Sequence, residues 1–284
     1  MKKLILGIAM LTGVSAIAQE LPQPSPTSVV KQKIGLTDVE VTYSRPSAKG
    51  RAIFGELVPF NEMWRTGANA NTIIEFSTEV NFGGTKVKAG KYSLFTIPGK
   101  GEWTIILNSK TDMWGTGNYS KVNDVARITV ESGSTANIET FTMSVDNLTA
   151  ESGDLTLAWE KTKVSISIKV DVAAKALKNI EAAIAEAKEG ESWKVYRNAA
   201  NYHFNNKIDL KMALSYMKKS LGENDESWYS YWLQAEIMAE LGMKTEAVKS
   251  AKKALEIGEA ASKKSEKEFK YAKMINSGMD SWKS

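Results

Sequence analysis

The spacing of apolar residues divides the chain into two parts. From residue 39 onward apolar and polar positions alternate, as in Val39–Tyr43, Lys91–Ile97 and Glu102–Leu107. This period of two predicts half-buried β-strands, and the intervening Pro98-Gly99 pair predicts a hairpin turn. The same pattern predicts further strands, at Thr72–Phe76, Ala126–Val130, Ile138–Val145, Leu155–Trp159 and Val164–Val170.

Residues 27–171 are therefore predicted to form one β domain. We expect about nine or ten short strands, with Glu160–Lys163 as a tight hairpin turn between the last two. Glycine-rich turns and the lack of intervening helices favour an antiparallel β-sandwich over a parallel sheet. The prolines at positions 22, 24 and 26 predict an extended linker over residues 19–26.

A helical period replaces the alternation after Asp171. No proline follows this position, and Ala, Glu and Lys dominate the sequence. Apolar residues recur every three or four positions, which predicts amphipathic helices; the first run comprises Ala176, Leu177, Ile180, Ala183, Ile184 and Ala187. Residues 172–284 are thus predicted to form an all-α domain, and the fold class is α+β in two domains.

An internal repeat lies within this helical part. Aromatic and small residues recur after 34 or 35 positions: Trp193, Tyr196, Ala200, Ala213 and Leu221 recur as Trp228, Tyr231, Ala235, Ala247 and Leu255. The period resembles the tetratricopeptide repeat, in which small residues let paired helices pack closely. The proline that usually closes such a repeat is absent, and Glu259 stands there. Tetratricopeptide-like helical hairpins are therefore predicted, with a generic helical bundle as the alternative.

The first 18 residues have the pattern of an export signal. Lys2 and Lys3 precede a short apolar run, Leu4–Val14, and Ala16–Ala18 supplies the small residues that a signal peptidase requires. A buried N-terminal helix is the alternative interpretation. The run is too short to span a membrane, and no other run approaches that length. We expect an exported protein, periplasmic or secreted, with no transmembrane segment after signal removal.

Composition removes several classes of function. The chain has no cysteine, which excludes disulfides, thiolate nucleophiles, zinc–thiolate sites and a lipoprotein anchor. The 37 basic and 33 acidic residues give a net charge of +4, which falls to +2 without Lys2 and Lys3. This balance gives no support for nucleic-acid binding. No cofactor is predicted.

The sequence also contains few of the residue types that catalyse reactions or bind metals. His203 is the only histidine, and one imidazole cannot build a three-ligand metal site. An oxygen-only calcium site remains an alternative, but the chain has no acidic ladder of the D-x-D-x-D-G type, and no metal is predicted. We expect its ring to pack on a helix surface. Paired-carboxylate hydrolysis remains an alternative, because acidic residues lie in the irregular connections of the β domain, where catalytic acids are common; these are Glu56, Glu62, Asp112 and Asp124.

The segment Arg45–Asn71 concentrates basic, aromatic and glycine residues. Its cations are suited to bind a carboxylate or phosphate, its amides add hydrogen bonds, and Trp64 offers a ring for stacking. The other interpretation is structural, with Trp64 in the core and Arg65 paired to a buried acid. A second aromatic cluster lies beside Gly115. The ligand-binding candidates are Arg45, Lys49, Arg51, Trp64, Arg65, Asn69, Asn71, Trp114 and Tyr119.

The same residues carry a family resemblance. The motifs, in chain order, are R-P-S-A-K-G-R-A-I-F-G-E-L-V-P-F, W-R-T-G-A-N, A-G-K-Y-S-L-F-T-I-P and W-T-I-I-L-N. Together they resemble the family called domain of unknown function 2911, found in exported proteins of Bacteroidetes and related bacteria. The resemblance covers the stretch from Ser25 to Asp171. It implies a β-rich exported domain, often followed by helices, and it implies no activity and no site residues.

The sequence therefore favours a non-enzymatic binding or scaffolding protein of the cell envelope. Helical repeats bind peptides or proteins, and β-sandwiches often bind ligands at their loop ends. We expect a protein or peptide partner on the helical domain and an anionic or glycan ligand on the β domain. The alternative is a carboxylate-dependent hydrolase that acts on a glycan or another envelope polymer.

Overall fold

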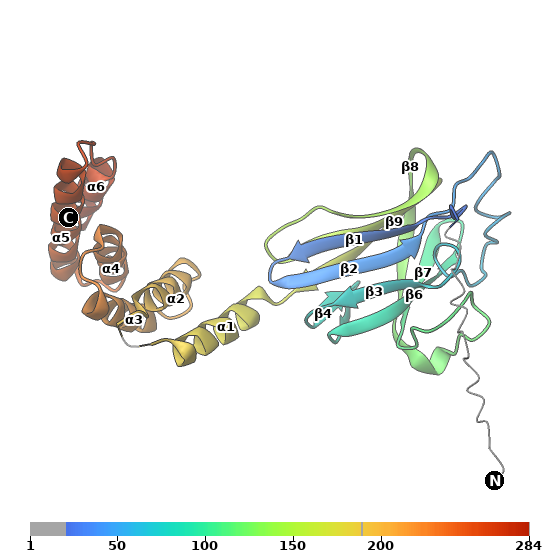
Figure 1. Ribbon diagram of the computed structural model, residues 1–284, viewed down its shortest axis with the longest axis horizontal. Helices are drawn as coiled ribbons and strands as arrows, with labels where there is room; N and C mark the ends of the chain where they lie inside the picture. The colour runs from blue at the N-terminus through green and yellow to red at the C-terminus, as the bar shows by residue number, and fades with distance from the viewer. Residues whose placement is uncertain (1–20, 189, 284) are drawn as a thin grey trace, which may run out of the picture. The chain divides into compact units, whose positions relative to one another are not determined.

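The computed structural model describes residues 21–188 and 190–283. The chain divides into two compact units, Met1–Val172 and Ala173–Ser284, which we call the β unit and the helical unit. A β-sheet in the first and helices in the second (Figure 1) confirm the α+β fold class. The predicted signal peptide, residues 1–18, lies outside the described residues.

Within the described residues, nine strands form an antiparallel sheet in the order β1-β2-β3-β6-β7-β8-β9-β4-β5. A short 3-10 helix, Lys121–Asn123, precedes β8. The strands are β1 (Thr27–Ile34), β2 (Thr37–Ser44), β3 (Thr72–Phe76), β4 (Val80–Phe82), β5 (Thr85–Val87), β6 (Gly90–Pro98), β7 (Glu102–Asn108), β8 (Asp124–Asp146) and β9 (Ser152–Val170).

The long strand β8 belongs to both layers of the fold. Up to Glu131 it pairs with β7, and from Ser132 it pairs with β9. The two layers face each other across the core: the ring of Tyr43 on β2 lies edge-on to that of Phe141 on β8, at 5.7 Å between centroids. The Tyr43 hydroxyl also accepts a hydrogen bond from the Met143 backbone N–H, at 2.8 Å. The predicted sandwich is thus confirmed as a sheet folded over at β8.

Two features of the strand prediction were wrong. The runs 126–130 and 138–145 are parts of the single strand β8, and both runs after residue 152 are parts of β9. The polar stretch 160–163 is not a hairpin turn. It is a continuous part of β9 that pairs with an irregular part of β8, where Glu160 has φ +53° and lies opposite Ile138. The stretch is polar because this part of the strand is largely exposed to solvent.

Large rings fill the part of the core beside the Arg45–Asn71 segment. The Trp64 and Trp159 rings stack at 5.9 Å between centroids, and Phe141 lies 5.0 Å from Trp64. Phe54 contacts Trp103 edge-on at 4.9 Å. Edge and offset ring contacts of this kind add stability beyond the area that they bury. The irregular segment is therefore anchored by aromatic residues from three strands, β7, β8 and β9.

The helical unit consists of packed helical hairpins in which consecutive helices pair. Helix α2 packs on α3, α4 on α5, and α5 on α6, as Figure 1 shows. None of the described helices is both long and apolar enough to cross a membrane. The helices are α1 (Val172–Glu186), α2 (Trp193–Asn205), α3 (Leu210–Glu223), α4 (Trp228–Glu240), α5 (Lys244–Lys264) and α6 (Ala272–Lys283).

The repeated small residues lie where the paired helices meet. Ala200 and its repeat partner Ala235 are fully buried. The same kind of hydrogen bond joins both helix pairs. The Ser250 hydroxyl of α5 donates to the Tyr231 carbonyl of α4 at 2.8 Å, and the Ser220 hydroxyl of α3 donates to the Trp193 carbonyl of α2. Small residues allow close helix approach, and these buried hydroxyls are satisfied by backbone carbonyls. The predicted helical hairpins are thus confirmed.

Candidate functional site

Trp64 lies in the core of the β unit. Its side chain is 8% exposed, and its indole N–H donates to the Gly67 carbonyl at 3.0 Å. The rings of Trp159 and Phe141 pack against it. This placement agrees with the structural interpretation of Trp64 and leaves its ring faces occupied by other side chains.

Arg45 joins the end of β2 to β8. Its Nε donates to the Phe141 carbonyl at 3.0 Å, and its Nη2 donates to the Thr142 hydroxyl at 2.7 Å. These bonds link positions about a hundred residues apart in the chain. The guanidinium group therefore closes the two layers of the sandwich at this end.

Arg51 and Lys49 lie together in the turn that follows. Arg51 donates from Nε to the Ala48 carbonyl at 2.9 Å and from Nη2 to the Ser47 carbonyl at 2.7 Å. Lys49 has φ +52°, and its backbone N–H donates to the Glu139 carboxylate at 2.7 Å. Both side chains are exposed, but the hydrogen bonds of Arg51 serve the turn itself.

Arg65 differs from these two residues. Its Nε atom is buried and has no hydrogen-bond partner among the described residues. No ion pair to Arg65 is present in that part of the chain either, so the expected buried acid is not found. The Arg65 carbonyl accepts a long hydrogen bond from the Thr72 N–H, at 3.5 Å.

The two asparagines of the segment support its path. Asn69 has φ +58° and donates to the Ser25 carbonyl at 3.2 Å. Asn71 is 6% exposed and donates to the Ser93 hydroxyl and, at 3.5 Å, to the Thr111 carbonyl. Both amides are therefore engaged by the protein itself.

In the second predicted cluster, beside Gly115, Trp114 faces solvent whereas Tyr119 belongs to an ion-pair network. Trp114 is 73% exposed and forms an isolated bridge with Ala70, so this loop lies against the Arg45–Asn71 segment. Tyr119 donates to Asp124 at 2.7 Å and accepts from Arg127 at 2.7 Å. Burial and then the Asp124 carboxylate raise the pKa of Tyr119. The structure therefore does not join Tyr119 and Trp114 in one stacking surface.

The four acids that a hydrolase would use have different surroundings. Glu56, Glu62 and Asp112 are exposed, whereas Asp124 pairs with Arg127 at 3.1 Å. No group of three or more His, Asp or Glu side chains is placed to hold a metal within residues 21–188 and 190–283.

His203 is buried rather than surface-packed. It is 7% exposed, and its ring lies edge-on to Tyr216 of α3, at 5.6 Å between centroids. Its Nδ1 has no hydrogen-bond partner in the described part of the chain. The expectation of a surface ring was wrong because the neighbouring helix covers this side of α2.

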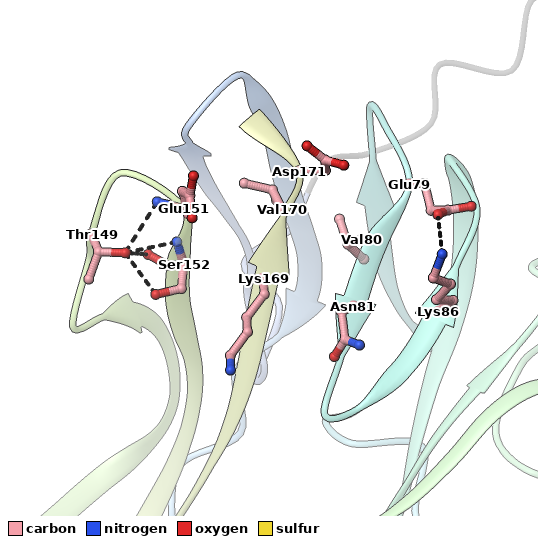
Figure 2. A pocket seen from close by; sticks show the side chains of 10 residues that line it. All are labelled: Glu79, Val80, Asn81, Lys86, Thr149, Glu151, Ser152, Lys169, Val170 and Asp171. Atoms are coloured by element: carbon pink, nitrogen blue, oxygen red, sulfur yellow. Dashed lines mark hydrogen bonds and ion pairs between the residues drawn. The ribbon is translucent and has the colours of Figure 1, made fainter. Parts of the chain in front are cut away.

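A cavity of about 600 Å³ in the β unit lies between β4, β9 and the loop before β9. Figure 2 shows two groups of contacts among its polar residues, one around Thr149 and one between Glu79 and Lys86. Glu79 pairs with Lys86 at 3.6 Å, and the Thr149 hydroxyl lies 2.8 Å from that of Ser152. Lys169 on β9 pairs directly with Asn81 on β4. The lining carries charges of both signs, and one lysine is already paired with a glutamate.

A smaller cavity, about 260 Å³, lies where β8 passes from one layer to the other. It is formed by the Arg45–Asn71 segment, the β6–β7 turn, β8 and β9. We call it the bend pocket; its lining includes Phe54, Phe60, Lys100, Ser132, Ser134 and Lys161. None of the predicted candidates lines it, although two of its rings belong to the predicted segment.

The helical unit presents aromatic and charged side chains where α2 meets α4. The Arg197 guanidinium lies 5.0 Å from the Trp193 ring centroid and 5.7 Å from that of Tyr229. The Tyr229 hydroxyl donates to Asn201 at 3.3 Å. Glu236 follows two turns later on the same side of α4, and burial raises its pKa to about 7. We call these five residues the α2/α4 face.

Sequence reasoning did not single out this face. Its signal was the crowding of aromatic residues at the first helix of each repeat, at positions 193, 196, 228, 229 and 231. The repeat pattern accounted for the regular spacing of some of them. Tyr229 and Arg197 fall outside the repeat equivalences, so the repeat pattern did not draw attention to them.

Comparison with known proteins identifies a family for the β unit. The family model described as "Protein of unknown function (DUF2911)" matches residues 25–168. No curated protein and no solved structure matches the chain.

Proposed function

Since the chain belongs to the DUF2911 family of proteins of unknown function, we propose its role from its own residues: an exported, non-enzymatic binding or scaffolding protein of the cell envelope. The observation that carries this proposal is the α2/α4 face. There, an arginine and two aromatic rings lie partly exposed on adjacent helices, without an ion-pair partner for the arginine in the described residues.

The chemistry of the face suits a peptide that carries a carboxylate. Aromatic residues and arginine are enriched in the centres of protein interfaces, because they bury large areas and make directed hydrogen bonds. Arg197 is held between the rings of Trp193 and Tyr229, so little side-chain entropy is lost when it binds. A planar guanidinium group then offers a bidentate contact to a carboxylate.

The proposed location rests on the first 18 residues. Two lysines, a short apolar run and the small residues Ala16–Ala18 form the pattern of a cleavable export signal. Export to the periplasm or beyond would place both units among envelope proteins and glycans. The β unit then supplies a second surface for a ligand, of anionic or glycan type.

Site-specific photo-crosslinking in intact envelopes tests the proposal. A photoreactive phenylalanine analogue replaces Tyr229, which is 37% exposed, or the control residue Met212 on α3, which is 41% exposed. We expect discrete adducts from position 229, their loss with the additional Arg197→Ala change, and none from position 212. Equal adducts from both positions, or none from position 229, would contradict the proposal.

A further inference from the structure

The bend pocket exists because several strands depart from regular pairing at one place. Strand β8 changes partner between Glu131 and Ser132, and its register against β9 shifts after Ser134. On β9, Glu160 has φ +53°, a backbone conformation that costs a non-glycine residue free energy. Bulges of this kind often re-aim side chains beside functional sites. Here the extra residues lie on β8 after Ser134, and Ser134 and its β9 neighbour Lys161 both line the pocket.

Two phenyl rings form the apolar part of the lining. Phe54 is held on one side by the buried ring of Trp103, at 4.9 Å between centroids, and is itself partly exposed. Phe60 lies over Gly55, where an added Cβ would come within 2.7 Å of the ring. The glycine therefore allows the second ring to fold back beside the first. Such rings can pack on the C–H groups of a sugar.

The polar part of the lining is basic and has free hydrogen-bonding capacity. Lys100 and Lys161 make no ion pair within the described residues. The hydroxyl groups of Ser132, Ser134 and Thr162 likewise make no hydrogen bond in that part of the chain. Each of these groups is thus available to a ligand.

Two acids in the adjoining strands β7 and β8 face away from the pocket. Glu102 and Glu131 are direct partners across β7 and β8, and Trp103 follows Glu102 in the strand. Side chains alternate between the two faces of a strand. Since Trp103 lines the pocket, the two glutamates lie on the other face. The residues that line the pocket thus include two lysines and no acid.

We infer that the bend pocket binds a sugar ring that carries a single anionic group. The phenyl rings would contact the ring, the lysines the anion, and the serines the sugar hydroxyls. At about 260 Å³ the pocket is small, which suits one sugar unit or the end of a glycan chain. Lysine is a point charge without a preferred planar partner, so carboxylate and phosphate are both accepted. The inference deepens the proposed binding role and rests on it.

Saturation-transfer NMR titrations with the full chain test this inference at low ionic strength, where exposed charges are least screened. The probes are glucuronate, glucose 6-phosphate, neutral glucose and acetate. We expect both anionic sugars to bind more tightly than glucose or acetate. The Lys100→Ala/Lys161→Ala double variant should bind them about tenfold more weakly. The matched control, Lys88→Ala/Lys110→Ala, removes the same charge from exposed sites elsewhere and should bind like the unchanged chain.

A Phe60→Leu variant tests the ring contact, because it keeps an apolar side chain and removes the aromatic face. It should weaken the binding of both anionic sugars, while its melting temperature stays within a few degrees of that of the unchanged chain. Equal binding of glucose and glucuronate, equal loss in both double variants, or no binding of either anionic sugar would overturn the inference. Cross-linking from Tyr229 probes the other unit, so its failure and the failure of this inference are distinguishable.

Discussion

In the β unit large rings pack on one another in the core, whereas in the helical unit fully buried alanines lie among larger apolar side chains where paired helices meet. The β-unit contacts are also distant in sequence: Tyr43 and Met143 are 100 positions apart. The helical contacts are local, as between Ser250 and Tyr231, which are 19 positions apart. The stability of the β unit should therefore be sensitive to lost side-chain volume, and that of the helical unit to side-chain volume added at its buried alanines.

The largest effect is expected from Trp64→Ala in the β unit. Truncating a buried tryptophan leaves a cavity and should lower the free energy of unfolding by about 3–5 kcal/mol. Hydrogen-exchange mass spectrometry should show faster exchange in the β unit alone. The control is Trp114→Ala, at a residue that is 73% exposed, with an expected change of about 0.5 kcal/mol or less. Loss of protection in both units would contradict the comparison.

Arg45→Met should have the next largest effect. It removes two charged hydrogen bonds between the layers, which should cost about 1.5–3 kcal/mol in a denaturant titration. Arg65→Met is the matched variant, because the Arg65 Nε has no partner among the described residues. Its expected change is less than about 1 kcal/mol, since an apolar side chain relieves an unsatisfied buried group. A larger cost for Arg65 would indicate a partner acid.

Added volume should destabilise the helical unit. Ala254 is fully buried on α5, so Ala254→Leu should overpack the helix contact and cost about 1–3 kcal/mol. Ala260→Leu makes the same change at an exposed position of the same helix. It should change stability by about 0.5 kcal/mol or less. Thermal melts followed by helical circular dichroism measure both, and equal effects would remove the distinction between the units.

The smallest predicted effect is a pH dependence confined to the helical unit. The Glu236 carboxyl has a reference pKa of 4.5, which burial raises to about 7 in the folded protein. Between these pH values the folded state binds more protons, so the free energy of unfolding falls as the pH rises. After allowance for partial exposure we expect a loss of roughly 1 kcal/mol across this window.

Glu236→Gln tests this dependence, because its amide carries no charge at any pH. Melting temperatures at pH 5 and pH 8 should differ less in this variant than in the unchanged chain. Glu240→Gln, at an exposed site of the same helix, should retain the full difference. If both variants behave alike, Glu236 does not carry the dependence.

The sequence predicted the features that depend on local spacing. The change from period two to a helical period located the two kinds of structure, and the repeated alanines at 200 and 235 identified positions that are fully buried. The polar stretch 160–163 was misjudged, because an exposed part of a long strand has the same composition as a turn. Its pairing with residues near Ser134 is set by distant contacts that no local pattern encodes.

The candidate sites show the same limit. Arg45 and Arg51 have the composition of a ligand site, yet their guanidinium groups bind carbonyls and a hydroxyl of their own chain. The bend pocket draws its lining from positions between 54 and 162 in four separate segments. Only the folded chain brings Phe54 and Lys161 together. A sequence can show that such residues are present but not that they meet.

Because β8 belongs to both layers of the β unit, insertions and deletions within this strand should be poorly tolerated. A single residue inserted near Gly133 would turn every later side chain of the strand to the opposite face, because the alternation has a period of two. Phe141 and Met143 would then leave the core. The loop at 147–151 is exposed and tolerates such a change far better. Insertions and deletions among relatives should therefore collect in that loop and spare the middle of β8.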